Sequence, residues 1–357
     1  MNRIDRRTYL AGLVGGAAAI AGCVGDEGGT VESDEAGDVV PPSAVKEASG
    51  LDDETGVVDS DLEGVEDEDE SDASNTDFAV GRVLEMGELQ VAVSGFDRKV
   101  DVVDASSGDV LGAEDGMAFA VVDLALKHDG TDGILSVDEQ LSVELGDGDG
   151  ESYDRFVAAD SESIDPTASR LAPGEVTRGD LVYEIAADSE GLALTLAALT
   201  NSAEYVVDLE TEDPTESTTL LEQNLTDEPR RFGQGVEIGD VAVTVRTLEQ
   251  GNNLGGFLQS DAGTEIVAVG VTIENQSGRE RTILSGQSEL KDEYGRSYHD
   301  VPRAVGTLQR LDGRTVKDGD VHEGKIAYQI EEGLSELYWT FDFAEWGDDH
   351  RTVWKLR

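Results

Sequence analysis

The sequence GDLVYEI at residues 179–185 and the sequence GKIAYQI at residues 324–330 share one pattern. In both, a glycine is followed by apolar side chains at every second position, with a tyrosine two residues before the last isoleucine. This alternation is what a β-strand with one buried face requires. The two stretches therefore predict the same strand twice, and with it a repeated β domain.

Other segments repeat at an offset of about 150 residues. Residues 87–93 resemble 239–245, residues 119–126 resemble 266–273, and residues 150–153 resemble 295–298. Short alternating strands separated by Gly, Asp and Asn clusters, within about 120 residues, favour an antiparallel sandwich. The sequence predicts an all-β fold with two tandem immunoglobulin-like β-sandwiches. Their expected bounds are residues 81–210 and 233–357, with a polar linker over residues 211–232.

The first residues of the chain have the parts of an export signal. A basic start precedes a short apolar stretch and small residues before a cut site. Arg6 and Arg7 resemble the twin-arginine export motif, and Ile20, Ala21, Gly22 and Cys23 resemble a lipobox, in which the cysteine is lipidated after cleavage.

We therefore predict a twin-arginine signal peptide over residues 1–22, read by the twin-arginine export machinery. We also predict a membrane anchor through a lipid on Cys23, the only cysteine. The alternative is an incidental thiol in an ordinary signal peptide. The apolar run has about a dozen residues, fewer than the roughly 20 that a membrane-spanning helix needs. The expected location is the outer face of the cell membrane.

Acidic residues dominate the segment that follows Cys23. Residues 24–77 contain about twenty acidic residues, one lysine and no aromatic residue. Such a segment buries too little apolar surface to offset its ordering entropy. We expect a disordered acidic tether over residues 23–80 that spaces the sandwiches from the membrane. A solvating acidic tail is the alternative.

The acidic excess continues through the expected sandwiches. The chain has 78 acidic and 26 basic residues and a formal net charge of −52. In molar salt the Debye length is about 3 Å, so these charges repel one another only weakly. The composition indicates a halophile, with a mesophilic acidic protein as the alternative. A surface this negative also repels phosphate backbones, which argues against nucleic-acid partners.

The order of the motifs resembles the telokin-like, immunoprotective-extracellular family. A lipobox and an acidic linker precede a long strand that ends near Asp129 or Asn275, then Gly-x-Ser-Tyr, Pro173-Gly174 and a closing strand. The resemblance implies immunoglobulin-fold domains of bacterial and archaeal lipoproteins, mostly of unknown function. It offers no catalytic residues. The second copy departs from the first by carrying residues 317–319, KDG, in place of Pro-Gly.

No motif in the sequence predicts catalysis, a cofactor or a metal site. Residues 147–151, DGDGE, start like a calcium loop, but Ser152 and Ala158 replace the turn glycine and the closing glutamate. A solvated turn is the favoured interpretation there. The four histidines lack ligand spacing. We expect a protein that is not an enzyme.

Three residues are candidates for contacts outside the chain. Trp346 lies in the sequence AEWG, which we interpret as a loop, and is the candidate for a ligand contact. Asn224 and Asn275 begin glycosylation sequons. We expect a non-catalytic binding or interaction module that contacts another surface protein or a glycan. The alternative is an extracellular solute- or metal-binding accessory protein of a transport system.

Overall fold

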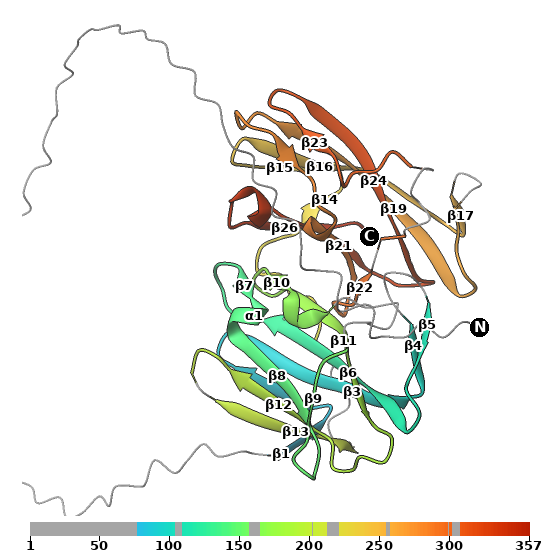
Figure 1. Ribbon diagram of the computed structural model, residues 1–357. Coiled ribbons are helices and arrows are strands. Elements are labelled where there is room, and N and C mark those ends of the chain that lie inside the picture. Colours follow the sequence, from blue (N-terminus) through green and yellow to red (C-terminus); the bar gives the residue numbers. More distant parts are fainter. Residues whose placement is uncertain are drawn as a thin grey trace, which may run out of the picture. The chain divides into compact units, whose positions relative to one another are not determined.

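The computed structural model describes most of the chain beyond residue 76 (Figure 1). The described residues are 77–103, 109–156, 165–201, 203–212, 221–254, 258–298, 300–301 and 308–357. All of them belong to one structural unit, residues 67–357. The predicted signal peptide, Arg6, Arg7, the lipobox, Cys23 and most of the predicted tether lie outside the described residues.

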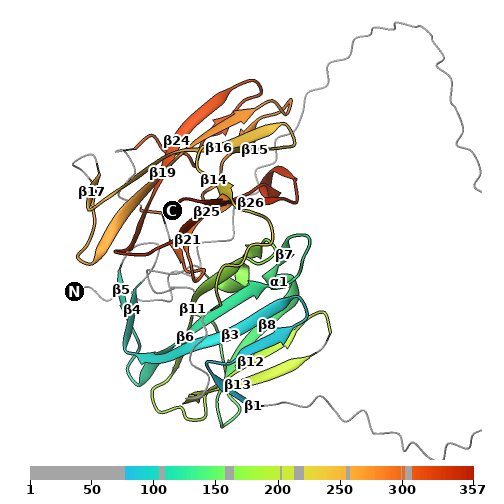
Figure 2. The same ribbon diagram turned by 180° about the vertical axis from the view of Figure 1, so that it is seen from behind.

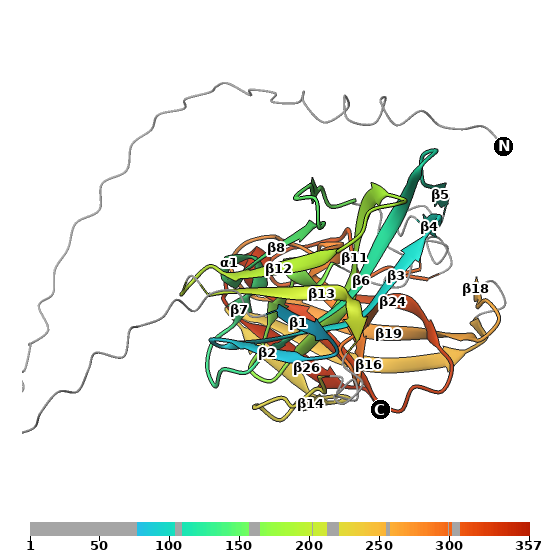
Figure 3. The ribbon, with the colours of Figure 1, turned by 90° about the horizontal axis from the view of Figure 1, so that it is seen from below.

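The first repeat, residues 77–212, is a sandwich of two sheets (Figure 1). One sheet has the order β1 (Asp77–Val80), β13 (Glu204–Glu212), β12 (Ala193–Ala198), β8 (Leu141–Gly146) and β9 (Ser152–Tyr153). The other has the order β11 (Val176–Ala186), β6 (Met117–His128), β3 (Leu89–Lys99) and β2 (Val83–Met86). Figure 3 shows β13 between β12 and β1. All pairs are antiparallel except β1 with β13.

The second repeat, residues 230–357, has the same topology (Figure 2). One sheet has the order β14 (Arg230–Arg231), β26 (Arg351–Lys355), β25 (Leu337–Asp342), β21 (Ser288–Asp292) and β22 (Ser297–Tyr298). The other has the order β15 (Gly235–Ile238), β16 (Val241–Gly251), β19 (Thr264–Asn275) and β24 (Val321–Glu331). Again only one pair, β14 with β26, is parallel among these strands. The prediction of two tandem β-sandwiches is confirmed.

Short elements connect the sheets. They are β4 (Asp101–Val103), β5 (Val110–Gly112), β7 (Leu135–Ser136), α1 (Val137–Gln140), β10 (Arg170–Leu171), β17 (Asn253–Leu254), β18 (Leu258–Gln259), β20 (Arg281–Thr282) and β23 (Thr315–Val316). Single 3-10 turns lie at Pro166–Ala168, Ser285–Gln287 and Ala344–Trp346. Among the described residues, no helix is long and apolar enough to span a membrane.

The core of each sandwich lies between its two sheets. Tyr183 on β11 and Tyr328 on β24 occupy equivalent positions, and both are buried. Leu181 and Ile185 flank the first tyrosine and point into the same core, as the alternating pattern predicts. Both tyrosines lie in the main hydrophobic cluster of their repeat, so the two matching sequences form the same inner strand twice.

Two boundaries differ from the prediction. The first sandwich begins at Asp77, within the predicted tether, because Phe78 packs against Tyr205 with ring centroids 5.7 Å apart and β1 pairs with β13. The predicted linker is also partly structured, since Arg230 and Arg231 pair with β26. Both segments are too short to show alternation, which is why the sequence pattern missed them.

Candidate functional site: a buried ion cluster and a pocket at the joint of the repeats

The turn between β10 and β11 is held against the end of β6. Gly174 donates its backbone N–H to the carbonyl of His128 at 2.7 Å, and His128 donates to the carbonyl of Glu175 at 3.1 Å. Gly174 has φ +78°, and a Cβ there would lie 1.9 Å from the carbonyl oxygen of Asn224 in the linker. Only glycine fits this close approach, so the turn and the linker form one packed unit.

Glu175 extends from this turn into a fully buried cluster of charges in the second repeat. Its side chain is 1% exposed, and Lys291 on β21 is 0% exposed. Oε1 of Glu175 accepts from Nζ of Lys291 at 2.7 Å and from Nη2 of Arg351 at 2.9 Å. Oε2 accepts from Nε of Arg351 at 2.9 Å and from the backbone N–H of Ala172 at 2.9 Å. The bidentate pair with Arg351 fixes the carboxylate in one orientation.

The same cations contact a second carboxylate. Nη2 of Arg351 donates to Oε2 of Glu289 at 2.8 Å, and Nζ of Lys291 lies 3.5 Å from that oxygen. Lys291 also donates to the carbonyl of Val176 at 3.2 Å. Nη1 of Arg351 also lies 3.7 Å from Oδ2 of Asp342, which pairs with Arg170. With Arg170 and Asp342 included, three cations face three carboxylates and the cluster has no net charge.

This arrangement keeps Glu175 ionised although it is buried. Burial alone would raise its pKa, but the charges of Arg351 and Lys291 outweigh burial and lower the pKa to about 2. Burial would likewise raise the pKa of Glu289, and the same two cations lower it. Both carboxylates are therefore charged at neutral pH, which is the state that holds the two repeats together.

Further contacts surround the cluster. The side-chain amide of Gln223 in the linker accepts from the backbone N–H of Val176 at 2.8 Å and donates to its carbonyl at 3.2 Å. Arg178 donates its backbone N–H to the carbonyl of Gly295 at 2.9 Å, and Arg170 pairs with Asp342 at 2.5 Å. At the start of β11, the backbone N–H and carbonyl of Val176 and the N–H of Arg178 are thus hydrogen-bonded by the linker and the second repeat.

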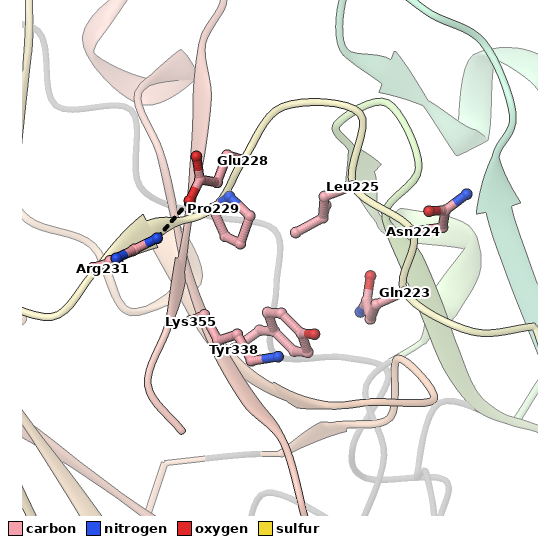
Figure 4. Close-up of a pocket in the computed structure, with 8 residues that line it drawn as sticks. All are labelled: Gln223, Asn224, Leu225, Glu228, Pro229, Arg231, Tyr338 and Lys355. Atoms are coloured by element: carbon pink, nitrogen blue, oxygen red, sulfur yellow. Dashed lines mark hydrogen bonds and ion pairs between the residues drawn. The ribbon is translucent and has the colours of Figure 1, made fainter.

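A pocket of 380 Å³ lies beside this joint (Figure 4). Its walls come from the linker and from β25 and β26, and its lining residues are Gln223, Asn224, Leu225, Glu228, Pro229, Arg231, Tyr338 and Lys355. Nζ of Lys355 pairs with Glu336 at 2.5 Å and lies 5.5 Å from the ring centroid of Tyr338. Amide, phenol, ammonium, guanidinium and carboxylate groups thus surround the apolar side chains of Leu225 and Pro229, and Arg231 pairs with Glu228 at 3.0 Å. Such a mixture suits a small polar ligand with one apolar face.

The predicted ligand contact at Trp346 is wrong. Its side chain is 5% exposed, its ring lies 5.3 Å from that of Phe341 and 5.8 Å from that of Phe343, and Nε1 donates to the carbonyl of Thr282 at 2.8 Å. The single 3-10 turn at Ala344–Trp346 folds the ring back onto the core. Trp346 is a core residue of the second sandwich.

The two sequon asparagines differ in accessibility. Asn224 and Thr226 are exposed in the linker, so glycosylation of Asn224 stays a prediction. Asn275 is 0% exposed, and its Nδ2 donates to the carbonyls of Arg279 at 2.7 Å and Val316 at 2.8 Å. The nitrogen that would carry the sugar is therefore buried and bonded, which contradicts the prediction of an acceptor at Asn275 in the folded chain.

Residues 147–151 form a turn between β8 and β9, as the favoured interpretation had it. Oδ1 of Asp147 accepts from the backbone N–H groups of Asp149 and Glu151, both at 3.0 Å, and Oδ2 accepts from the hydroxyl of Tyr153 at 2.6 Å. The bond from Tyr153 is the main reason that the pKa of Asp147 is lowered. Within the part of the chain that the structure describes, no group of three ligating side chains could hold a metal ion.

Several solved structures are similar to parts of the chain. The yjhA protein of Bacillus subtilis is 18% identical, with 36% of this chain and 99% of that chain covered and a TM-score of 0.30. A conserved hypothetical protein of Bacillus anthracis is 25% identical, with 35% and 91% covered and a TM-score of 0.29. An uncharacterized β-sandwich protein of Clostridium difficile is 16% identical, with 38% and 95% covered and a TM-score of 0.28. No protein of curated function matches the chain.

A family match coincides with the two sandwiches. The family described as a domain of unknown function (DUF4352) matches residues 78–205 and residues 231–351. The first match begins one residue after β1 starts, and the second begins within β14. Together the matches span more than half of the chain. The chain therefore belongs to the DUF4352 family and carries two copies of its domain.

Proposed function

We propose that the chain is a non-catalytic binding module that a halophile displays on the outer face of its cell membrane. The observation that carries the proposal is the joint: buried, mutually paired charges join the two sandwiches beside an open pocket. A frame held this firmly presents its loops and pocket in one fixed geometry. Fixed geometry reduces the entropy that binding costs, which suits a module whose task is recognition.

The pocket is the proposed contact site, and site-directed crosslinking tests it. A photo-crosslinking residue in place of Leu225 or Glu228 should capture a surface protein or glycan on intact cells in high salt. The matched control places the same residue at Glu139, an exposed position in α1. Capture from both positions alike, or from neither, would exclude the pocket as the contact site.

A solute-binding accessory protein of a transporter is the second candidate, because 380 Å³ lies within the roughly 300–1,000 Å³ of small-ligand pockets. Titration of the purified chain with calcium and with sugars, followed by melting temperature, separates the two candidates. A specific ligand stabilises the folded state by RT ln(1 + [L]/Kd). A saturable rise in melting temperature that Tyr338→Phe or Lys355→Met reduces would favour the accessory protein.

The display at the membrane depends on the export signal and on Cys23. A lipid contributes about 0.8 kcal/mol per buried methylene, so two acyl chains hold firmly where one does not. Mass spectrometry of the mature protein should find an N-terminal Cys23 carrying lipid, and Cys23→Ala should release the protein into the medium. Paired replacement of Arg6 and Arg7 by Lys should retain the precursor inside the cell. A mature chain that starts elsewhere would refute the anchor.

The halophilic origin rests on the charge of −52. On dialysis from molar salt into dilute buffer, we expect the far-ultraviolet circular dichroism of the sandwiches to be lost, because screening of the acidic surface is lost. A spectrum that stays unchanged through the dialysis would remove this part of the proposal.

A further inference from the structure

Each repeat carries the same two surfaces, and the joint uses only one of each. In the first repeat, the joint consists of the turn at residues 172–178, called the docked turn. In the second repeat, it consists of the hairpin of β21 and β22 at residues 288–298, called the docked hairpin, together with Arg351 on β26 of the same sheet. The second repeat has its own turn between β23 and β24, residues 317–323, the open turn. The first repeat has its own hairpin of β8 and β9, residues 141–153, the open hairpin (Figure 1).

The open turn has the same backbone structure as the docked turn. Gly319 donates its N–H to the carbonyl of Asn275 at 2.7 Å, and Asn275 donates to the carbonyl of Asp320 at 3.1 Å. These are the lengths of the matching bonds around Gly174, and Gly319 has φ +80°. The surface that receives a hairpin in the first repeat is therefore already formed in the second.

In the open turn, Asp318 accepts from the backbone N–H of Gly278 at 2.9 Å and His322 lies 3.2 Å from the carbonyl of Arg310, but Gly319 and Val321 are left open among the described residues. Val321, at the start of β24, is 59% exposed, whereas Val176 at the start of β11 is 0% exposed. A Cβ on Gly319 would meet no atom within 4 Å, whereas one on Gly174 would collide with the linker. The open turn thus presents an exposed valine, Val321, next to a carboxylate, Asp320. The docked turn has the same two groups, Val176 and Glu175, and there the second repeat buries them.

The sheet that holds the open hairpin differs in charge from the sheet that holds the docked hairpin. The strand registers give the equivalent positions of the two repeats. Gly146 in the first repeat is equivalent to Lys291 in the second, because each pairs with the same position of the neighbouring strand, β12 or β25. Glu204 is equivalent to Arg351 for the same reason. The two positions that supply the buried cations in the second repeat thus hold a glycine and an acid in the first. If the open hairpin of one copy met the open turn of another, Glu204 would face Asp320 with no cation between them.

We propose that the open turn is a docking surface for a β-sheet of another protein. That sheet would carry basic residues at the positions of Gly146, on the strand equivalent to β8, and of Glu204, on the strand equivalent to β13. The sheet of the open hairpin in this chain lacks those charges, which keeps copies of the chain from joining one another. The inference builds on the proposed binding function by naming a surface and a class of partner. It needs neither the lipid nor the pocket.

The test makes the missing basic sheet from the chain itself. The probe is the full mature chain with Gly146→Lys, Glu204→Arg and Asp320→Lys, where the last change blocks the probe's own open turn. A Cβ on Gly146 lies 3.4 Å from its nearest neighbour, an ordinary contact, and Glu204 is exposed, so both positions accept the change. A mixture with the unchanged chain in molar salt should form a 1:1 complex by sedimentation velocity at concentrations below about 1 mM.

The matched control uses Asp320→Lys in the unchanged partner, which should weaken the complex at least about tenfold. A second, milder probe keeps Gly146 and carries only Glu204→Arg and Asp320→Lys. It should bind the unchanged chain more weakly than the full probe does. If both probes keep the circular dichroism of the unchanged chain and neither forms a complex, the proposal is refuted. Because this assay contains no membrane and no ligand, its failure would leave the proposals on anchoring and on the pocket intact.

Discussion

Replacement of Glu175 by Gln tests the joint most directly. The change keeps the shape of the side chain and removes its charge, so Lys291 and Arg351 lose their closest counterion while they stay buried. Breaking a buried ion pair costs about 3–5 kcal/mol because the remaining charge is uncompensated. Glu289 still lies within 2.8 Å of Arg351 and 3.5 Å of Lys291. We therefore expect a loss near the lower end, about 3 kcal/mol.

Two optical probes separate the joint from the sandwiches. Trp339, Trp346 and Trp354 are the only tryptophans and all lie in the second repeat. Tryptophan fluorescence therefore reports unfolding of that repeat, and far-ultraviolet circular dichroism reports both. In guanidinium titrations at molar salt the unchanged chain should give coincident transitions, because the joint couples the repeats. In Glu175→Gln the transitions should separate.

The control is Asp320→Asn, the equivalent turn carboxylate of the second repeat. It is exposed, so its loss should change stability by no more than about 0.5 kcal/mol. If Glu175→Gln resembles Asp320→Asn in both midpoint and coincidence, the cluster does not couple the repeats, and the argument for a rigid frame fails.

Three further outcomes follow from the structure. Gly295→Ala should destabilise the chain more than Gly150→Ala. Both glycines have positive φ, so each variant costs roughly 1–2 kcal/mol in backbone strain, but only a Cβ on Gly295 would also lie 2.7 Å from the backbone of Val176. Equal denaturant midpoints for the two variants would refute this prediction. Trp346→Ala should lower stability by about 3–5 kcal/mol, and a melting temperature close to that of the unchanged chain would contradict the burial of Trp346. Acid should weaken the joint, because the pKa of Glu175 falls from 4.5 to about 2 on folding. The resulting stabilisation of the folded chain is complete above pH 4.5 and is lost as the pH falls toward 2, a change on the order of 3 kcal/mol. Urea titrations at several pH values should show this change, and Glu175→Gln should remove it.

The strands of the sandwiches could be predicted because their signal is local. Leu181, Tyr183 and Ile185 alternate along one strand and all enter the same core, so pattern alone places them. The parallel edge strands β1 and β14 have only four and two residues, and their pairing depends on β13 and β26, which are far away in sequence. No local period can show such a pair.

The joint was missed for the same reason. Glu175 lies 116 residues from Lys291 and 176 from Arg351, so nothing near any one of them shows its partner. The strand registers place Lys291 and Arg351 where the first copy has Gly146 and Glu204. Positions where the two repeats share apolar alternation identify the strands. Positions where the charge of the side chain differs between the repeats would have identified the residues of the joint. Trp346 was misplaced because four residues of local sequence cannot tell a loop from a turn folded onto the core.

The choice of ions rather than apolar residues at the joint is informative. Replacing a buried ion cluster by apolar side chains is often neutral or stabilising, so stability alone does not explain Glu175, Lys291 and Arg351. If the joint were apolar, the equivalent surfaces at the open turn and the open hairpin would be apolar as well, because the two repeats share one fold. Exposed apolar patches of this kind associate non-specifically. Charges allow the two repeats to differ at two positions, Gly146 and Glu204. On the docking proposal above, this difference lets the joint within the chain form and prevents the same contact between copies of the chain. The pairs are buried, so salt that screens the acidic surface leaves them largely unscreened, and the joint keeps its specificity at ionic strengths where surface charges lose theirs.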